Sequence, residues 1–296
     1  MKPLLETLTS GSEYLAKRGV EDSRLNMEHL LAHVLHCRRL DLYLRFNEML
    51  GETQLAPLRG LLKRRGEGEP LQHILGTVEF HGHEFVSDSR ALVPRPETEH
   101  LVAIMAEKFF RDTTPGRMLD VGTGSGCIGL SLSKAWPLCE VTLADISEDA
   151  LELARLNAGR LGLQPRFIRS DLFEKITGTF DLIIANLPYM PLSEKISLQR
   201  EVLRDPPTAL FGGHTGLEIV ERLIAESPAH LAAGGLIALE LHHDQTSRVS
   251  ERLRNGGFSG IETGRDLAGI ERFVFAVAQT AGSDAVKVIE TVSGEA

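Results

Sequence analysis

The stretch LDVGTGSGCIGL, residues 119–130, decides the fold of this chain. An apolar segment ends at Asp120 and Val121, a run of glycines follows, and a helical pattern begins after it. Glycine lets the backbone adopt positive φ and approach a ligand closely, and the start of a helix offers unpaired N–H groups. This order of strand, loop and helix predicts a ligand site at the carboxyl edge of an open α/β sheet.

Two ligand classes fit the glycine loop. Residues 124–129 match the dinucleotide fingerprint GxGxxG, and Asp145 follows about twenty residues on, where that fingerprint places a ribose-binding acid. Alternatively, Asp120 precedes the pattern GxGxG at residues 122–126. A carboxylate repels a pyrophosphate but attracts the ammonium and sulfonium groups of S-adenosylmethionine. Asp120 therefore favours S-adenosylmethionine as the cofactor.

Strands and helices alternate around this loop, which predicts a parallel sheet covered on both faces by helices. Helical patterns cover 97–110 and 147–162, and Ser147 can cap the second. The expected strands are 117–121, 141–145, 166–170, 180–186, 235–241 and 271–278.

Residues 1–75 predict a small, all-helical domain without strands. Ser23 and Thr53 can each cap a run of apolar residues at helical spacing, and the polar stretch 63–70 predicts the exit from the helices. Residues 76–95 predict a hairpin linker, with an irregular linker as the alternative. The α/β domain is expected over 96–279, followed by a flexible tail over 280–296.

The composition is that of a globular protein, with 42% hydrophobic and 25% charged residues in 296. Residues 1–78 hold 11 Lys/Arg and 10 Asp/Glu, so the net charge of −9 leaves −10 on the remainder. Such an acidic domain is a poor candidate for binding nucleic acid directly. Neither a membrane span nor a signal peptide is visible, so we expect a cytoplasmic protein without membrane partners. Its three cysteines, at 37, 127 and 139, are expected to be reduced.

Acidic residues close the next two expected strands. The carboxylate of Asp145 can accept hydrogen bonds from both ribose hydroxyls, whereas the alternative role of helix cap suits Ser147 better. Asp171 can accept from an adenine amino group while Leu172 packs on the ring, although a cap or turn aspartate is an equal alternative.

The fourth strand runs into Asn186, Leu187, Pro188 and Tyr189. An amide nitrogen is a weak nucleophile because its lone pair is delocalised into the carbonyl. The Asn186 oxygen and the carbonyl of residue 187, which Pro188 keeps extended, can accept its two hydrogens, and Tyr189 offers a flat face. The segment predicts a site that methylates an amide nitrogen by positioning, with no metal. A simple Asn–x–Pro turn is the alternative.

At this point the chain resembles the HemK/PrmC family of protein-glutamine N-methyltransferases, over nearly its whole length to about residue 279. PRPETE and GGxxGL are more specific than the glycine loop. The matching stretches are 70–85, 92–102, 119–132, 144–158, 170–173, 185–190, 201–217, 234–240 and 266–276.

The resemblance implies a helical domain that docks a peptide chain release factor and a class I, Rossmann-like S-adenosylmethionine methyltransferase domain. It implies methyl transfer to the glutamine of a Gly-Gly-Gln loop. The residues expected to bind the cofactor, which include the three acids at the strand ends, are Asp120, Gly122, Thr123, Gly124, Ser125, Gly126, Asp145, Asp171, Leu172 and Asn186. The glutamine would bind at Asn186, Leu187, Pro188 and Tyr189. Arg95 and Glu97 could orient the substrate or cover the cofactor, or Glu97 could simply favour the helix dipole.

The chain departs from the family pattern at two motifs. It has NLPY where the family has NPPY, so Leu187 supplies the carbonyl without the stiffness of a proline ring. His242 replaces a glycine in LELHHDQ, and we interpret it as a partly exposed histidine at a strand end. Three alternatives stay open: a ribosomal-protein glutamine methyltransferase, an amino-methyltransferase of nucleic acid, and a cofactor binder without catalysis.

Overall fold

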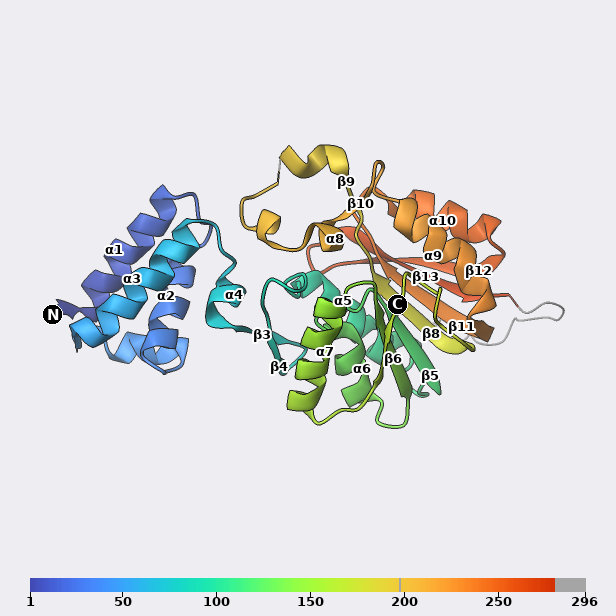
Figure 1. Cartoon of the computed structure of the whole chain (residues 1–296), viewed down its shortest axis with the longest axis horizontal. Coiled ribbons are helices and arrows are strands. Elements are labelled where there is room, and N and C mark those ends of the chain that lie inside the picture. The colour runs from blue at the N-terminus through green and yellow to red at the C-terminus, as the bar shows by residue number, and fades with distance from the viewer. Residues whose placement is uncertain (197, 280–296) are drawn as a thin grey trace, which may run out of the picture. The chain divides into compact units, whose positions relative to one another are not determined.

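The structure is a computed structural model that describes residues 1–196 and 198–279, so the predicted tail lies outside the described residues (Figure 1). It divides into two compact units. Met1–Val78 together with Leu198–Arg204 form the first, here called the helical unit, and the rest of the described chain forms the α/β unit. Within the described ranges, no helix combines the length and apolar character that a membrane crossing requires.

The α/β unit is built on one seven-stranded sheet, which confirms the predicted fold class (Figure 1). The central strands β5, β6, β7, β8 and β11 pair in parallel, and β13 pairs antiparallel with both β11 and β12. In sheet order the strands are β12 (Phe258–Arg265), β13 (Glu271–Ala278), β11 (Leu231–Glu240), β8 (Phe180–Asn186), β5 (Arg117–Val121), β6 (Glu140–Asp145) and β7 (Arg166–Arg169).

The sheet differs from the prediction at one edge. The sheet is mostly parallel, as predicted, but β13 runs antiparallel, and β12 was not predicted. Only a few residues join β12 to β13, and so short a connection requires antiparallel strands. The sequence FSGIETGR of β12 contains two glycines and few apolar residues, so it lacks a clear strand pattern.

Helices pack against the sheet in two groups. The first group packs together near β5, β6 and β7, and the second packs beside β12 and β13 (Figure 1). Ser147 caps the helix that starts at Glu148 by accepting from the Ala150 N–H, as predicted. The first group is α5 (Pro96–Ile104), which continues as a π-helix over Met105–Phe109, α6 (Cys127–Ala135) and α7 (Glu148–Leu161), and the second is α9 (Glu218–Glu226) and α10 (Thr246–Asn255).

Short pairs of strands lie outside the main sheet. In the predicted linker, β3 (Thr77–Phe80) pairs with β4 (His83–Val86), and the two residues between them, His81 and Gly82, both have positive φ. Positive φ at both central positions is typical of a type I′ hairpin turn. Further along the chain, β9 (Met190–Pro191) pairs in parallel with β10 (Phe211–Gly213), which follows the short helix α8 (Pro207–Leu210).

The helical unit buries one apolar core between its helices, built from residues such as Leu8, Met27 and Leu58. The prediction of no strands was wrong in one detail, because β1 (Lys2–Pro3) pairs with β2 (Met49–Leu50). Two residues are too few to leave a pattern in the sequence. The helices are α1 (Leu4–Lys17), α2 (Ser23–Val34), α3 (Glu52–Gly66) and α4 (Leu71–Leu75), with a 3₁₀ turn over Arg39–Leu44.

Neither predicted cap in the helical unit was correct. Ser23 is already helical, and Asp22 occupies the cap position in a left-handed conformation, which offers no side-chain acceptor to the helix. Thr53 also lies inside its helix; there the Gln54 side chain instead accepts from the N–H of Gly51, the cap residue, at 2.9 Å. In both cases the helix begins one or two residues earlier than the pattern suggested.

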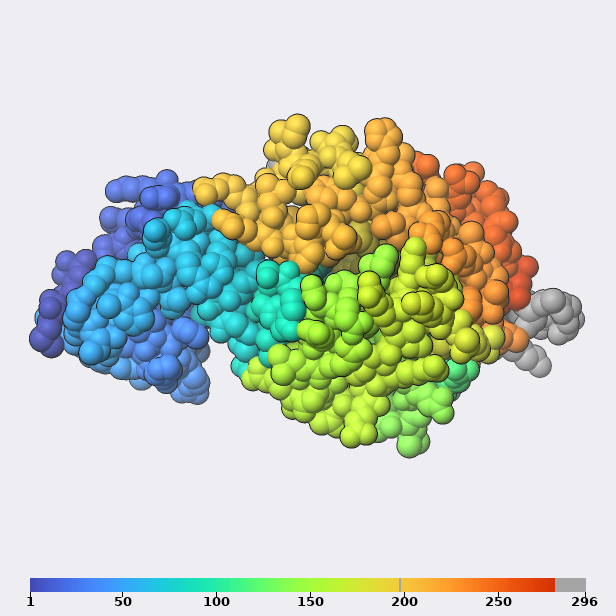
Figure 2. Space-filling model, viewed as in Figure 1, coloured from blue at the N-terminus to red at the C-terminus, as the bar shows by residue number. Residues whose placement is uncertain are grey.

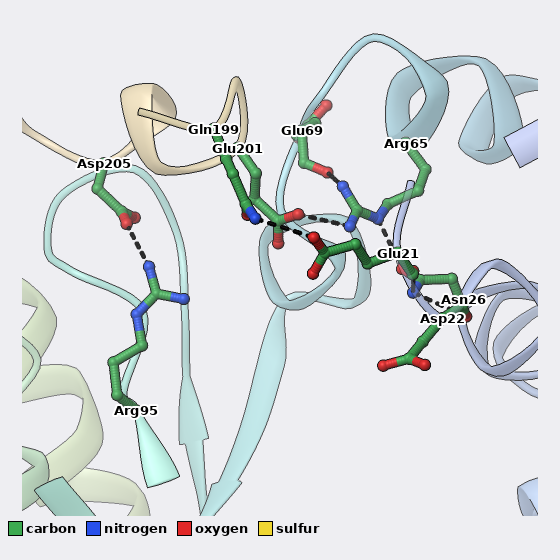
Figure 3. Close-up of polar contacts among 9 residues, drawn as sticks. All are labelled: Glu21, Asp22, Asn26, Arg65, Glu69, Arg95, Gln199, Glu201 and Asp205. Atoms are coloured by element: carbon green, nitrogen blue, oxygen red, sulfur yellow. Dashed lines mark hydrogen bonds and ion pairs between the residues drawn. The ribbon is translucent and has the colours of Figure 1, made fainter. Parts of the chain in front are cut away.

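The segment Leu198–Arg204 joins the helical unit through Arg65 (Figure 3). The Arg65 side chain is buried; its Nε donates to Asn26 Oδ1 at 2.6 Å, and its Nη2 pairs with Glu201 at 2.5 Å. Gln199 adds a hydrogen bond to Glu21 at 3.1 Å. Nothing in the sequence pattern predicts that this distant segment belongs with the helices.

Candidate active site

A cavity lies at the carboxyl edge of the α/β unit, where β5 and β8 are neighbours. The order of strands reverses between these two, and open α/β sheets bind their ligands at such a switch point. In the space-filling view, the surface near residues 150–175 (yellow-green) borders that of residues 206–226 (orange) (Figure 2). The lining includes residues 90–92, 94–95, 121–125, 145–147, 170–172, 186–188 and 206, 208 and 209.

The glycine loop forms one wall of this cavity and requires its glycines. Gly122, Gly124 and Gly126 have φ of +71°, +57° and +82°, the left-handed region that only glycine adopts freely. A Cβ on Gly122 would lie 2.7 Å from the Leu187 side chain. The loop and the Asn186–Tyr189 segment therefore approach each other as closely as the absence of a side chain allows.

Asp120 lies behind the loop, fully buried, and is not among the residues that line the cavity. Its Oδ2 accepts from the Thr123 hydroxyl at 2.6 Å and from the Gly129 N–H at 3.0 Å. Burial raises the pKa of Asp120 to about 7. In the structure this carboxyl group holds the two ends of the loop together.

Asp145 ends β6 and lies on the cavity wall. One carboxylate oxygen accepts from the Gly124 N–H and the other from the Ser147 N–H, both at 2.9 Å. Burial raises the pKa of Asp145. A carboxylate has about four acceptor sites, so both oxygens keep capacity for the hydroxyls of a ribose.

Asp171 and Leu172 line the cavity after β7. Leu172 is buried with a φ of +46°, an uncommon conformation for a residue other than glycine, asparagine or aspartate. The Asp171 carboxylate pairs with Arg222 at 3.2 Å, and its side chain is partly exposed. Both residues thus lie where the sequence placed them, at the end of the third strand.

Asn186, Leu187 and Pro188 line the cavity opposite the glycine loop. Tyr189 is not in the lining; its ring lies 6.1 Å from that of His242, and burial raises the pKa of its hydroxyl to about 12. His242, in turn, contacts Asp244 at 2.7 Å through its Nδ1. The structure therefore brings three of the four residues of this segment to the cavity and leaves Tyr189 beside it.

The motif FGGHTGL, residues 211–217, packs against the backbone of the Asn186–Tyr189 segment. A Cβ on Gly212 would lie 2.2 Å from the Pro188 carbonyl oxygen, and one on Gly216 would lie 2.2 Å from that of Tyr189. The Gln245 side chain also donates to the Tyr189 carbonyl at 2.9 Å. The sequence indicated that this motif is specific, but not that its glycines allow two backbones to touch.

Arg95 lines the cavity, whereas Glu97 does not. The guanidinium of Arg95 pairs at 3.0 Å with Asp205, whose side chain is buried (Figure 3). Glu97 lies in the first turn of α5, which matches its alternative role at the helix start. The sequence pattern did not indicate Thr98, Asp205 or Glu240, because a single buried polar residue in a helix, in a loop or at a strand end leaves no periodic signal.

The residues at the cavity fit S-adenosylmethionine. The glycine loop leaves a cradle that side chains would fill, and the acidic group of Asp145 suits a ribose and a positively charged ligand. Seven strands with an antiparallel β13, together with this site at the switch point, define a class I S-adenosylmethionine-dependent methyltransferase. A solved methyltransferase from Pyrococcus furiosus shares the fold, with a TM-score of 0.51 and 22% identity, covering 66% of this chain and 89% of that one.

Comparison of sequences gives the family. Residues 6–76 match the PrmC N-terminal domain, and residues 97–213 match the methyltransferase small domain. A release factor glutamine methyltransferase of Deinococcus radiodurans is 40% identical over 92% of this chain and 97% of its own length. Another release factor glutamine methyltransferase, from Rhodopirellula baltica, is 39% identical over 92% of this chain and 94% of its own length. The chain belongs to the release factor glutamine methyltransferase family, which confirms the resemblance, the enzyme class and the cofactor.

Proposed function

We propose that this enzyme methylates the side-chain amide nitrogen of the glutamine in the Gly-Gly-Gln motif of peptide chain release factors. The observation that carries the proposal is that Asn186, Leu187 and Pro188 line the same cavity as the glycine loop and Asp145. A planar amide held by the first segment therefore lies next to a methyl donor held by the second.

Positioning supplies the catalysis. The Asn186 side-chain oxygen and the Leu187 carbonyl accept the two hydrogens of the substrate amide, which favours a pyramidal nitrogen with a localised lone pair. When bound, S-adenosylmethionine supplies an electrophilic methyl group on a sulfonium. The substrate nitrogen would take this methyl group in exchange for one proton, which would pass to water, and the sulfur would leave as the neutral thioether of S-adenosylhomocysteine. Holding the substrate nitrogen, the methyl carbon and the sulfur in line reduces the entropic part of the activation barrier.

The helical unit is the proposed docking domain for the release factor. The match of residues 6–76 to the PrmC N-terminal domain supports this assignment. With such a substrate we expect the enzyme in the cytoplasm, with no membrane partner and no direct nucleic acid partner. The net charge of −10 on residues 79–296 disfavours a nucleic acid amino group as the substrate, since phosphate binding needs clustered positive charge.

Mass spectrometry of a co-expressed release factor tests the proposal. We expect one added methyl group on the Gly-Gly-Gln glutamine, and none when that glutamine is changed to glutamate. In the same cells, ribosomal proteins should gain no methyl label. A methyl group on a ribosomal protein glutamine, with the release factor unmodified, would contradict the assigned substrate while leaving the amide chemistry in place.

Asn186→Ala tests the catalytic role directly. We expect turnover to fall on the order of a hundredfold or more, because a positioned hydrogen-bond acceptor is lost. Calorimetry should show a much smaller change in affinity for S-adenosylmethionine. Turnover close to that of the unmodified enzyme would remove Asn186 from the mechanism.

A further inference from the structure

Three polar side chains meet where β8 and β11 end. Asn186 and Glu240 are register partners on these two adjacent parallel strands. Thr98, near the start of α5, accepts a hydrogen bond from Asn186 Nδ2 at 3.0 Å. Thr98 and Glu240 are only 3% and 2% exposed. Thr98 and Asn186 each lower the pKa of the Glu240 carboxyl, but burial outweighs them and raises it to about 7. The buried Oε2 of Glu240 has no hydrogen-bond partner within the described residues.

The chemistry of this cluster fixes the direction of the Asn186 amide. A primary amide has an NH₂ group with two donors and an oxygen that only accepts, whereas an ionised carboxylate only accepts. The Thr98 oxygen accepts from the NH₂ group of Asn186, and the neighbouring Glu240 carboxyl favours the same orientation when it is ionised. In the part of the chain that the structure describes, no protein donor is bonded to Asn186 Oδ1. Asn186 lines the cavity, so this oxygen is the atom left for a ligand.

We propose that Thr98 and Glu240 are positioning residues, which hold the Asn186 carboxamide with its oxygen toward the substrate glutamine. The proposal rests on the proposed role of Asn186 and extends it to two neighbours that act through Asn186: Glu240, which lies outside the cavity lining, and Thr98, which is part of it. An acceptor that is already oriented costs no reorganisation when the amide nitrogen reacts. It also gives a function to Thr98, the fifth residue of the PRPETE motif at 94–99.

Substitutions that preserve shape separate orientation from folding. Glu240→Gln keeps the size of the side chain but adds a donor, which lets the Asn186 amide turn its oxygen inward. Thr98→Val removes the acceptor, and Thr98→Ser restores it. Matched controls are Thr142→Val, at a buried threonine of β6, and Glu99→Gln, at a glutamate of α5 that accepts from the His81 N–H.

Kinetics at pH 8 on an intact release factor give the readout. For Glu240→Gln and Thr98→Val we expect kcat to fall about tenfold or more, with KM and the Kd for S-adenosylmethionine changed less than about threefold. Thr98→Ser and both controls should stay close to the unmodified enzyme. A rise in KM or Kd with kcat unchanged would overturn the positioning role, since it would indicate a binding or folding defect.

A double-mutant cycle distinguishes this inference from the proposed function. If Glu240 acts through Asn186, adding Glu240→Gln to Asn186→Ala should cost less than about twofold further in kcat. If the double variant instead loses kcat by the product of the two single losses, the inference is refuted. Normal turnover of Asn186→Ala alone would instead refute the catalytic role on which it rests. Should Glu240→Gln melt well below the unmodified protein, the contrast between Thr98→Val and Thr98→Ser decides, and equal kcat values for these two would refute the inference.

Discussion

Burial of the Asp120 carboxyl group makes the stability of this protein depend on pH. The structure gives its carboxyl group two hydrogen bonds, to Thr123 and Gly129, but burial outweighs them and raises its pKa from 3.8 to about 7. Between those two pH values the unfolded chain has lost the Asp120 proton and the folded chain still binds it. Folding therefore loses stability as the pH rises from about 4 to about 7, and the loss is complete above that range.

We predict that Asp120→Asn reduces this loss. The free energy of unfolding of the unmodified protein should fall between pH 4 and pH 7 by up to about 4 kcal/mol more than that of the variant, the value for three pKa units. Glu240 has a pKa raised in the same direction, so part of the slope should remain. Urea unfolding at several pH values measures the difference, with the exposed Glu140→Gln as control. Parallel curves for Asp120→Asn and the unmodified protein would contradict the assignment.

At the scale of the elements, the site depends on backbone segments that touch. The loop between β10 and α9 contains Gly216, whose φ is +81° and whose missing Cβ leaves room for the Tyr189 carbonyl. Gly234, in β11, has a similar φ of +75° but no atom within 4 Å of its Cβ position. Alanine at Gly234 therefore measures the cost of an unfavourable φ alone, whereas alanine at Gly216 adds the cost of a steric collision.

We predict that Gly216→Ala inactivates the enzyme and that Gly234→Ala does not. Both should lose about 1 kcal/mol of stability, the cost of a left-handed conformation with a Cβ, and Gly216→Ala should lose more because its Cβ collides with the Tyr189 carbonyl. Only at position 216 must the Asn186–Tyr189 segment also move, and a displacement of about 1 Å can cost a hundredfold in rate. Methyl transfer assays and thermal melting measure the two effects. Equal activities in the two variants would show that the contact with Tyr189 is not needed.

The sequence predicted the elements that carry strong patterns. Apolar strands that carry Asp120, Asp145 and Asn186 at or next to their ends were located because strand, loop and helix alternate in a parallel sheet. Contacts between distant segments were not predicted, because they depend on the three-dimensional path of the chain. Thr98 beside Asn186 and Gly216 beside Tyr189 are two such contacts, and neither has a local signal.

At the scale of the whole molecule, the chain crosses between its two units three times. It passes after Val78, again before Leu198, and again after Arg204. The middle segment is held in the helical unit by Arg65, whose side chain is 6% exposed in its ion pair with Glu201. The neighbouring Arg64 makes a similar pair with Glu69 at the surface, where its side chain is 45% exposed.

We predict that the buried ion pair of Arg65 contributes much more to the free energy of unfolding than the exposed ion pair of Arg64. Arg65→Met leaves the Asn26 oxygen and the Glu201 carboxylate without their donor, so we expect a loss of about 2–3 kcal/mol in the free energy of unfolding. Arg64→Met should lose less than about 1 kcal/mol, since water screens the exposed pair. Hydrogen exchange should accelerate over residues 198–204 only in the first variant. If both variants exchange alike there, Arg65 does not hold the segment, and its attachment must come from the remaining contacts of Gln199 and Arg200 with the helices.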